Sequence, residues 1–306
     1  MNKVWLTGDA VVDLIPDGDA HYLKCPGGAP ANVAVSISRL EGNCGFFGRV
    51  GQDPMGNFMA ETLANENVDI NGLTFDPLHR TSTVVVDLDD SGERTFTFMV
   101  KPSADQFLHV SDIPQFGQNE WLHLCSIALA NEPSRSSTFE AINRLKQAGG
   151  SFSFDPNIRE EVWANPETLI PTVHQAIKLA DVVKFSEEEL TMLTGATTLD
   201  EGLGAIASYA IPLVVVTLGA QGTLVVFNGY KEIIPACSVK VVDTTGAGDA
   251  FVGGLLCKLS ESNDWQQLET IREAVLWGNC CGGLATTQKG AMSALPKRAE
   301  LIELVG

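Results

Sequence analysis

Apolar residues along this chain form short continuous runs, separated by longer stretches in which they recur at helical spacing. A run such as LVVVTL at 213–218 is typical of a strand that is buried on both faces of a sheet. After the GGAP sequence at 27–30, Val33, Ile37 and Leu40 follow the period of an amphipathic helix. The repeated alternation of the two patterns predicts an α/β fold, with a mostly parallel sheet covered by helices on both faces.

The same patterns predict where the other elements lie. Strands are expected at 3–8, 45–50, 121–127, 151–155, 182–185, 213–218, 222–227 and 239–242. Helices are expected at 29–40, 134–148, 167–179, 186–193, 247–260 and 268–285. For the helix at 186–193, Ser186 is a typical N-cap residue and Gly195 a typical stop.

Two segments follow a different pattern. In RTFTFM at 94–99, Thr95 and Thr97 alternate with Phe96 and Phe98, and TVVVDL at 83–88 precedes them. With DDSG at 89–92 as the turn, they predict a β-hairpin. We therefore expect residues 1–306 to form a single α/β domain with a small β excursion, built from about 14–26 and 75–105. Over the carboxyl ends of a parallel sheet, such an excursion would serve as a lid.

Composition excludes several classes of partner. A formal net charge of −18 disfavours broad binding of nucleic acid or of an anionic membrane. The chain has no long apolar run and no signal-peptide pattern at its start, so we expect a cytoplasmic protein.

The seven cysteines include no C-x-x-C pair, which predicts reduced thiols, with Cys280 and Cys281 as packing residues of a helix. The five histidines are scattered and do not have the spacing of a zinc site.

The stretch VDTTGAGDAF at 242–251 carries the most specific chemistry. Gly246, Ala247 and Gly248 precede Asp249 at a predicted helix start, without the lysine of a Walker loop and without the third glycine of a dinucleotide fingerprint. Free backbone N–H groups there would stabilise charge on a transferring phosphoryl group, while Asp249 would take a proton from the acceptor hydroxyl. The alternative is that Asp249 only caps the helix.

Motifs along the whole chain resemble those of the ribokinase-like (PfkB) family of carbohydrate kinases. DTTGAGDAF resembles the C-terminal signature of that family, and GGAPANVAVSISRLEGNCGFFGRVGQDPMG at 27–56 resembles the N-terminal one. Six shorter pieces match in order: GDAVVD, PSAD, FDPN-I-R, KFSEEEL, TLGAQG and TTQKGAMSALP. The resemblance implies a three-layer α/β/α sandwich with a β-hairpin lid, and an ATP-dependent transfer of phosphate to a sugar.

For the reaction and the sugar, the resemblance implies roles residue by residue. Asp249 would be the catalytic base, and Gly246, Ala247 and Gly248 would form the anion hole. The sugar would contact Asp13, which we expect on the loop after the first strand, together with Gly28, Asn32, Phe98 and Arg159. Four of these residues have a structural alternative: Asp13 could be a solvated loop carboxylate, Asn32 an ordinary first-turn helix residue, Phe98 a packing residue of the hairpin and Arg159 part of an ion pair.

For the nucleotide and the ions, the resemblance implies a second set. Six residues match the nucleotide region of the family: Lys184, Glu189, Thr217, Gly219, Gly222 and Asn279. The glutamate-rich helix face around Glu189 could instead be merely solvated, and Asn279 could be only a packing residue. A monovalent-cation loop would use Asp243 and Thr245 with carbonyls near Ala285, Gln288 and Gly290. The implied cofactors are therefore ATP, Mg²⁺ and K⁺.

Within the family, GGAPANVA, GERTFTF and FDPN-I-R followed by Trp163 are most similar to fructokinases. They are nearly as similar to aminoimidazole riboside kinases. We expect D-fructose as the acceptor, with its 6-hydroxyl toward Asp249. A non-catalytic sugar or nucleotide sensor is the competing class, and the intact GAGD sequence disfavours it. A monomer and a homodimer are both compatible with the sequence.

Overall fold

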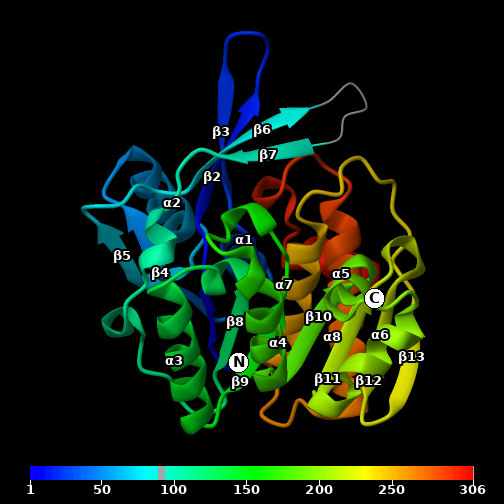
Figure 1. Ribbon diagram of the computed structural model, residues 1–306. Helices are drawn as coiled ribbons and strands as arrows, with labels where there is room; N and C mark the ends of the chain where they lie inside the picture. The colour runs from blue at the N-terminus through cyan, green and yellow to red at the C-terminus, as the bar shows by residue number, and fades with distance from the viewer. Residues whose placement is uncertain (89–93, 306) are drawn as a thin grey trace.

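A single large sheet forms the centre of the molecule. The computed structural model describes residues 1–88 and 94–305, and within them nine strands pair in the order β13-β12-β11-β10-β9-β8-β1-β4-β5 (Figure 1). All neighbours from β11 to β5 are parallel, whereas β12 and β13 are antiparallel additions at one edge. The strands are β1 (Val4–Thr7), β4 (Cys44–Gly51), β5 (Asp69–Asp76), β8 (Trp121–Cys125), β9 (Ser151–Asp155), β10 (Val182–Ser186), β11 (Leu213–Thr217), β12 (Thr223–Phe227) and β13 (Tyr230–Ile234).

Helices cover both faces of this sheet, as the apolar strands require. Val4 and Leu6 of β1 face one layer, whereas Trp5 faces the other, because successive strand residues alternate. The first layer contains α1 (Ala29–Arg39), α2 (Pro54–Asn65), α7 (Ala247–Leu259), α8 (Leu268–Ala285) and α9 (Arg298–Val305). The second contains α3 (Ser134–Gln147), α4 (Leu169–Leu179), α5 (Glu187–Thr194) and α6 (Leu199–Ile206). Across the described ranges, no helix has the length and apolarity needed to cross a membrane.

A smaller sheet projects from one end of the central one (Figure 1). It pairs β3 (Tyr22–Gly27), β2 (Val11–Pro16), β6 (Thr83–Leu88) and β7 (Arg94–Phe98) in that order. The predicted hairpin is confirmed, since β6 and β7 are antiparallel with Val84 opposite Phe98. The DDSG turn predicted at 89–92 lies outside the described residues.

One predicted strand is wrong. Residues 239–242 have no strand structure, and Val241 and Val242 are exposed on a loop. The edge position is taken by β13, which follows β12 through Asn228 and Gly229, both with positive φ. Asn-Gly is the preferred sequence for such a tight hairpin turn, so the local signal favoured β13 over a strand nine residues later. The expectations also omitted α2, β5, α6 and α9.

Candidate active site

Functional side chains gather at the carboxyl edge of the central sheet. Asp9 follows β1, Asp155 ends β9, and Lys184 lies near the end of β10. The smaller sheet covers this edge, because Asp13 on β2 and Phe98 on β7 line the same cavity. This edge cavity has a volume of about 240 Å³. The carboxyl edge of a parallel sheet is the usual place for a ligand site in α/β proteins.

The start of α7 brings Asp249 into the edge cavity. The helix follows Gly246, whose φ of 77° is left-handed and whose Cβ, if present, would lie 2.9 Å from the Cα of Ala291. Gly246 is the N-cap, and Asp249 lies in the first turn, so the alternative of Asp249 as the capping residue is wrong. Instead, the Nδ2 of Asn32 donates a hydrogen bond to the Oδ2 of Asp249 over 2.8 Å.

The environment of Asp249 tunes its acidity. Loss of solvation raises the pKa of Asp249 to about 6, although the hydrogen bond from Asn32 and the charges of Lys184 and Arg159 work in the opposite direction. The carboxylate is therefore ionised at neutral pH but is more basic than an ordinary aspartate. A general base is most effective with a pKa close to the working pH.

Two glycines bring the chain close to acidic residues on the other side of the cavity. A Cβ at Gly27 would lie 2.5 Å from the Oδ2 of Asp13, and one at Gly28 would lie 2.4 Å from the carbonyl oxygen of Asp9. Gly28 also has a φ of 96°, which favours glycine. Asp13 was expected on a loop, but it lies inside β2, because the chain turns at 8–10 and pairs with β3 and β6 from Val11 onward.

Asn32, Phe98 and Arg159 complete the walls of the edge cavity. Asn32 is buried in the first turn of α1, and its Oδ1 has no hydrogen-bond partner within the described residues. Arg159 donates to the carbonyl of Ile158 over 2.8 Å, and no carboxylate of ranges 1–88 and 94–305 forms an ion pair with it. Its guanidinium is thus available to a ligand, which favours a binding role over the structural ion pair.

Lys184 joins the edge cavity to the start of α7. Its Nζ lies 3.0 Å from the Oδ2 of Asp155, and a Cβ at Gly248 would lie 3.6 Å from it. Burial works to lower the pKa of Lys184, but Asp155 and Glu189 raise it above its usual range. Lys184 therefore stays positively charged beside the glycines that precede Asp249.

Glu189 is fixed by the cap of α5 rather than solvated. Its Oε2 accepts a hydrogen bond from the backbone N–H of Ser186 over 2.9 Å, and the Oγ of Ser186 accepts one from the N–H of Glu189 over 3.1 Å. This reciprocal capping box confirms the predicted helix start, and the left-handed Gly195 confirms the predicted end. The glutamate is thus held toward Lys184 and Asp155.

A second cavity lies between β11–β12 and helices α7 and α8. This α7–α8 cavity has a volume of about 550 Å³ and is lined by Thr217, Gly219, Gly222, Ala247, Gly248 and Asn279, among others. Gly248 lines both cavities, so the turn before Asp249 forms the passage between them. Four of the six predicted nucleotide residues thus line this cavity, Lys184 lines the edge cavity, and Glu189 lines neither.

Asn279 shapes the α7–α8 cavity through three hydrogen bonds. Its Oδ1 accepts from the hydroxyl of Thr223 over 2.6 Å, and its Nδ2 donates to the carbonyls of Ile234 and Pro235 over 2.9 and 3.0 Å. Gly222 has a φ of 106°, and a Cβ there would lie 2.1 Å from the oxygen of Ile234. These contacts hold the edge of the sheet and the following loop against α8.

The predicted cation loop is built from two segments that lie side by side. The Oδ1 of Asp243 accepts from the hydroxyl of Thr245 over 2.7 Å, and its Oδ2 accepts from the N–H of Gly290 over 3.0 Å. Ala285 ends α8, and Gln288 lies between it and Gly290. The two segments are therefore fixed next to Gly246, on which Ala291 packs.

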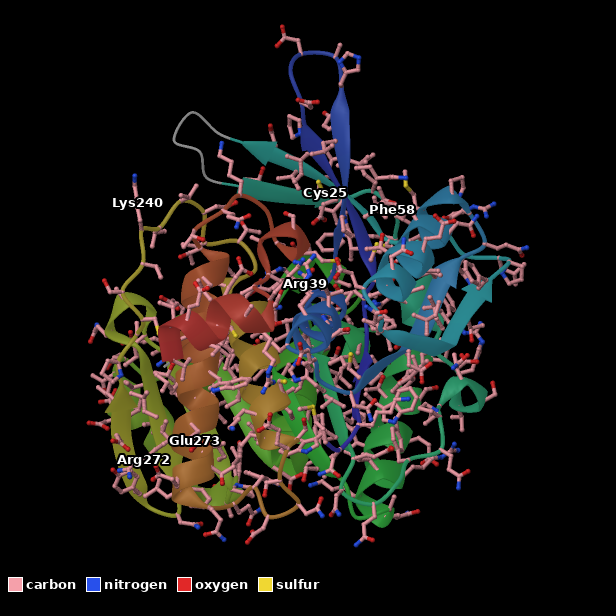
Figure 2. All side chains as sticks on the ribbon, turned by 180° about the vertical axis from the view of Figure 1, so that it is seen from behind. Cys25, Arg39, Phe58, Lys240, Arg272 and Glu273 are labelled. Atoms are coloured by element: carbon pink, nitrogen blue, oxygen red, sulfur yellow. A yellow bond between two sulfur atoms is a disulfide. The ribbon has the colours of Figure 1, made fainter. Side chains whose placement is uncertain are left out.

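Arg39 of α1, labelled in Figure 2, holds the part of the chain that follows Gly290. Its guanidinium donates to the carbonyls of Met292 and Leu295 over 3.0 and 2.7 Å and pairs with Glu66 over 2.6 Å. Because both oxygens of Glu66 accept from the same guanidinium, the arginine has a fixed orientation.

The sequence matches a known family over nearly its full length. Residues 1–298 match the pfkB family carbohydrate kinases. The chain belongs to this family. Its sheet order and helical layers are those of a ribokinase-like pfkB kinase, as the resemblance implied.

Individual pfkB kinases are similar over their whole length. A fructokinase of Vibrio alginolyticus is 60% identical over 306 residues, which is 100% of each chain. The crystal structure of a fructokinase double mutant from Vibrio cholerae O395, in a fructose-, ADP- and potassium-bound form, has a TM-score of 0.96 at 66% identity and covers 100% of this chain and 99% of its own. An aminoimidazole riboside kinase from Salmonella enterica, complexed with its riboside and an ATP analogue, has a TM-score of 0.93 at 39% identity and 100% coverage of both chains.

Three carboxylates of this pfkB kinase were missed as site residues. Asp9, Asp105 and Asp155 lie inside the GDAVVD, PSAD and FDPN pieces, yet only Asp13 and Arg159 of those pieces had been assigned roles. All three are buried, and each has an Oδ1 with no hydrogen-bond partner in the described part of the chain. The available signal was their position at or a few residues beyond the ends of predicted strands, where side chains from different strands meet.

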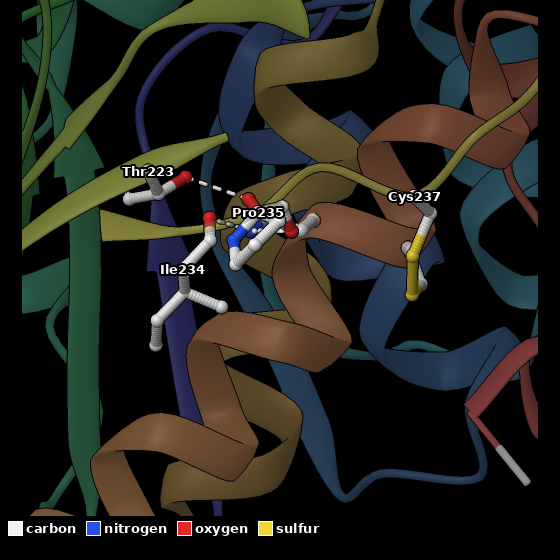
Figure 3. The surroundings of a disulfide bond; sticks show 6 residues. Thr223, Ile234, Pro235 and Cys237 are labelled. Atoms are coloured by element: carbon white, nitrogen blue, oxygen red, sulfur yellow. Dashed lines mark hydrogen bonds between the residues drawn. A yellow bond between two sulfur atoms is a disulfide. The ribbon is translucent and has the colours of Figure 1, made fainter. Parts of the chain in front are cut away.

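The expectation that all cysteines of this pfkB kinase are reduced is wrong. Cys237 and Cys280 form a disulfide, and their Cα atoms are 5.2 Å apart (Figure 3). The loop after β13 passes along α8, held there by Asn279, and this brings together cysteines that are 43 residues apart. Cys280 is thus a cross-link and not only a packing residue, whereas Cys281 is a free, buried thiol.

Proposed function

We propose that this pfkB kinase transfers the γ-phosphate of ATP to the 6-hydroxyl of D-fructose. The observation that carries the proposal is the place of Asp249 and the turn before it, where the edge cavity and the α7–α8 cavity meet. The similarity to fructokinases at 60 and 66% identity supports fructose as the acceptor.

The edge cavity would bind the sugar. Asp13 offers two carboxylate oxygens to neighbouring ring hydroxyls, and the unpartnered Oδ1 of Asn32 can accept from another. Gly28 lines the same cavity, and Phe98 of the smaller sheet would cover the sugar ring. In this arrangement the two excursions at about 14–26 and 75–105 act as a lid on one kinase domain.

Asp249 would act as the general base. With a pKa of about 6, it is ionised at neutral pH and can accept the proton of the 6-hydroxyl as that oxygen attacks the γ-phosphate. The hydrogen bond from Asn32 orients the carboxylate. The backbone N–H groups of Gly246, Ala247 and Gly248, with the charge of Lys184, would stabilise the phosphoryl group during transfer. Arg159 can contact the same group from the sugar side.

The α7–α8 cavity would hold ATP. Thr217, Gly219 and Gly222 line the side near β11 and β12, and Asn279 lies on the side of α8. The phosphates would lie toward Ala247 and Gly248, which also line the cavity, and the nucleoside would lie toward Asn279. The structures of the Vibrio cholerae O395 fructokinase with ADP and of the Salmonella enterica riboside kinase with an ATP analogue support this assignment.

The residues present also fit the expected ions. Asp155 has a buried, unpartnered Oδ1 beside Glu189 and Lys184, which suits a hydrated Mg²⁺ held on ATP phosphates. When bound, Mg²⁺ would neutralise phosphate charge. Asp243 and Thr245, with the carbonyls of Ala285, Gln288 and Gly290, supply only oxygen donors, the set that K⁺ takes. The potassium-bound fructokinase supports this second site.

The proposed substrates also bear on the cellular location of the protein. ATP and free sugars are cytoplasmic metabolites, which supports a cytoplasmic location, whereas the disulfide between Cys237 and Cys280 does not. The net charge of −18 disfavours nucleic acid and anionic membranes as partners. A monomer and a homodimer are both compatible with this function.

Coupled ATP-consumption assays test the proposal. D-fructose, ribose, glucose, nucleosides and aminoimidazole riboside would be compared under the same conditions, with product identity checked by mass spectrometry and NMR. We expect the highest kcat/KM for D-fructose and a phosphate on its 6-oxygen. A preference for aminoimidazole riboside would replace the acceptor but keep the mechanism, whereas binding without turnover would indicate a sensor.

A further inference from the structure

Two buried carboxylates, Asp9 and Asp105, face a third cavity that the reaction above does not use. This side cavity has a volume of about 470 Å³ and adjoins the edge cavity, because Asp9, Phe98 and Ile127 line both. Asp9 follows β1, and Asp105 lies in a short 3-10 turn (Ala104–Phe107) after β7. The central sheet and the chain that follows the smaller sheet thus bring the two residues together.

Both carboxylates lack a hydrogen-bond partner for one oxygen. Asp9 is 4% exposed and Asp105 is 5% exposed, and the Oδ1 of each is unpartnered within ranges 1–88 and 94–305. The Nε1 of Trp163, which lines the same cavity, is also buried without a partner there. Unsatisfied buried polar atoms are costly, so their grouping around one cavity points to a polar ligand that satisfies them.

Neighbouring side chains hold Asp105 in position. The Nε2 of Gln106 donates to its Oδ2, and the Oε1 of Gln106 accepts from the Nδ2 of Asn131 over 3.1 Å. Asn131 in turn donates to the carbonyl of Val162 over 2.9 Å. The second oxygen of Asp105 therefore points to a fixed place rather than turning to find a partner of its own.

The charges around the pair favour a neutral ligand. Burial and the nearby Asp105 raise the pKa of Asp9 to about 7, and burial raises the pKa of Asp105. Burial thus favours the neutral, protonated form of both carboxyl groups, and a protonated carboxyl group can donate a hydrogen bond as well as accept one. The other charged groups that act on Asp9 or line the side cavity are Asp249, Arg159, Lys101, Glu132 and Glu161.

We propose that Asp9 and Asp105 determine sugar specificity by binding the hydroxyls on C1 and C2 of the ketose. This inference rests on the proposed function. In a fructofuranose, C1 is attached to C2 and C6 to C5, on opposite sides of the ring oxygen. With the 6-hydroxyl at Asp249, the C1 end extends toward Asp9, where the edge cavity opens into the side cavity. A neutral hydroxyl group both donates and accepts, as the carboxyl pair requires.

Steady-state kinetics with sugar analogues test this assignment. Wild type, Asp9→Asn and Asp105→Asn would be compared on D-fructose, 1-deoxy-D-fructose and 2,5-anhydro-D-mannitol, which lacks the anomeric hydroxyl. In wild type we expect each analogue to lose about 10- to 100-fold in kcat/KM. Each variant should raise KM for fructose by a similar factor, leave KM for ATP unchanged, and lose most of its discrimination against at least one analogue.

Controls separate binding from folding. Glu132→Gln makes the same carboxylate-to-amide change at an exposed residue of the side cavity and should retain full discrimination. Unchanged thermal unfolding and ATP binding would show that the variants are folded. If the penalties for both analogues are the same in the variants as in wild type, the carboxyl pair does not read the sugar and the inference fails. A wild type that leaves fructose unphosphorylated would instead overturn the proposed function and this assignment together.

Discussion

Substitution of Asp249 by Asn should lower activity but raise the stability of the fold. Changing Asp249 to Asn keeps the shape and an oxygen that can accept from Asn32, but it removes the group that takes the proton. Loss of a general base costs about 10²- to 10⁴-fold in kcat. We expect that loss, with the affinity for ATP within a few-fold of wild type.

The same change should stabilise the fold above pH 6. The pKa of Asp249 is raised from 3.8 to about 6, so the folded chain holds its proton more tightly than the unfolded chain. The ionised carboxylate therefore destabilises the fold progressively as pH rises from 3.8 to 6, and fully above that. The gap corresponds to at most about 3 kcal/mol, an upper limit because Asp249 is only half-buried.

Three measurements check this reasoning. Urea unfolding should show a stability gain of the variant over wild type that is about twice as large at pH 8 as at pH 5, and Asp264→Asn serves as an exposed control. The kcat/KM of wild type for fructose should fall tenfold per pH unit below about 6. A variant that turns over within a few-fold of wild type, or an acid limb near pH 4, would refute the role of Asp249 as a base of raised pKa.

Four further outcomes are expected. Asp13→Ala should lose about 3–5 kcal/mol of transition-state stabilisation, because two charge-assisted hydrogen bonds disappear; an unchanged KM for fructose would show that it does not contact the sugar. Asn279→Ala should raise KM for ATP about tenfold by releasing the loop after β13, and equal ATP kinetics would contradict this. K⁺ should accelerate turnover relative to Na⁺, and equal rates would remove the cation loop. Cys237→Ser should lower the free energy of unfolding by about 4 kcal/mol through loss of a 43-residue cross-link, and dithiothreitol should then destabilise wild type but not the variant.

Local patterns in the sequence predicted the elements whose signal is local. The run at 213–218 became β11, the alternation at 94–99 became β7, and the cap at Ser186 began α5 where expected. In each case the residues that carry the pattern also make the contacts that stabilise the element. The strand predicted at 239–242 failed because sheet pairing is a competition, and β13 reached the edge through a tight turn.

The candidate site was predicted in part, for a similar reason. The glycine turn before Asp249 has its own sequence signature, and the family resemblance supplied the other assigned residues. The meeting of Asp9 and Asp105, which are distant in sequence, has no such signature. It depends on how the chain after β7 returns to the end of β1, which no short stretch specifies.

The sequence by itself thus determined the β–α alternation, the hairpin and the chemistry of the turn at 246–249, since each follows from periodicity or from neighbouring residue types. Only the tertiary structure decided that Asp13 lies in a strand, that Cys237 meets Cys280, and which carboxylates converge on one cavity. Those features depend on strand order and long-range packing, because residues far apart in the chain become neighbours only when the layers assemble.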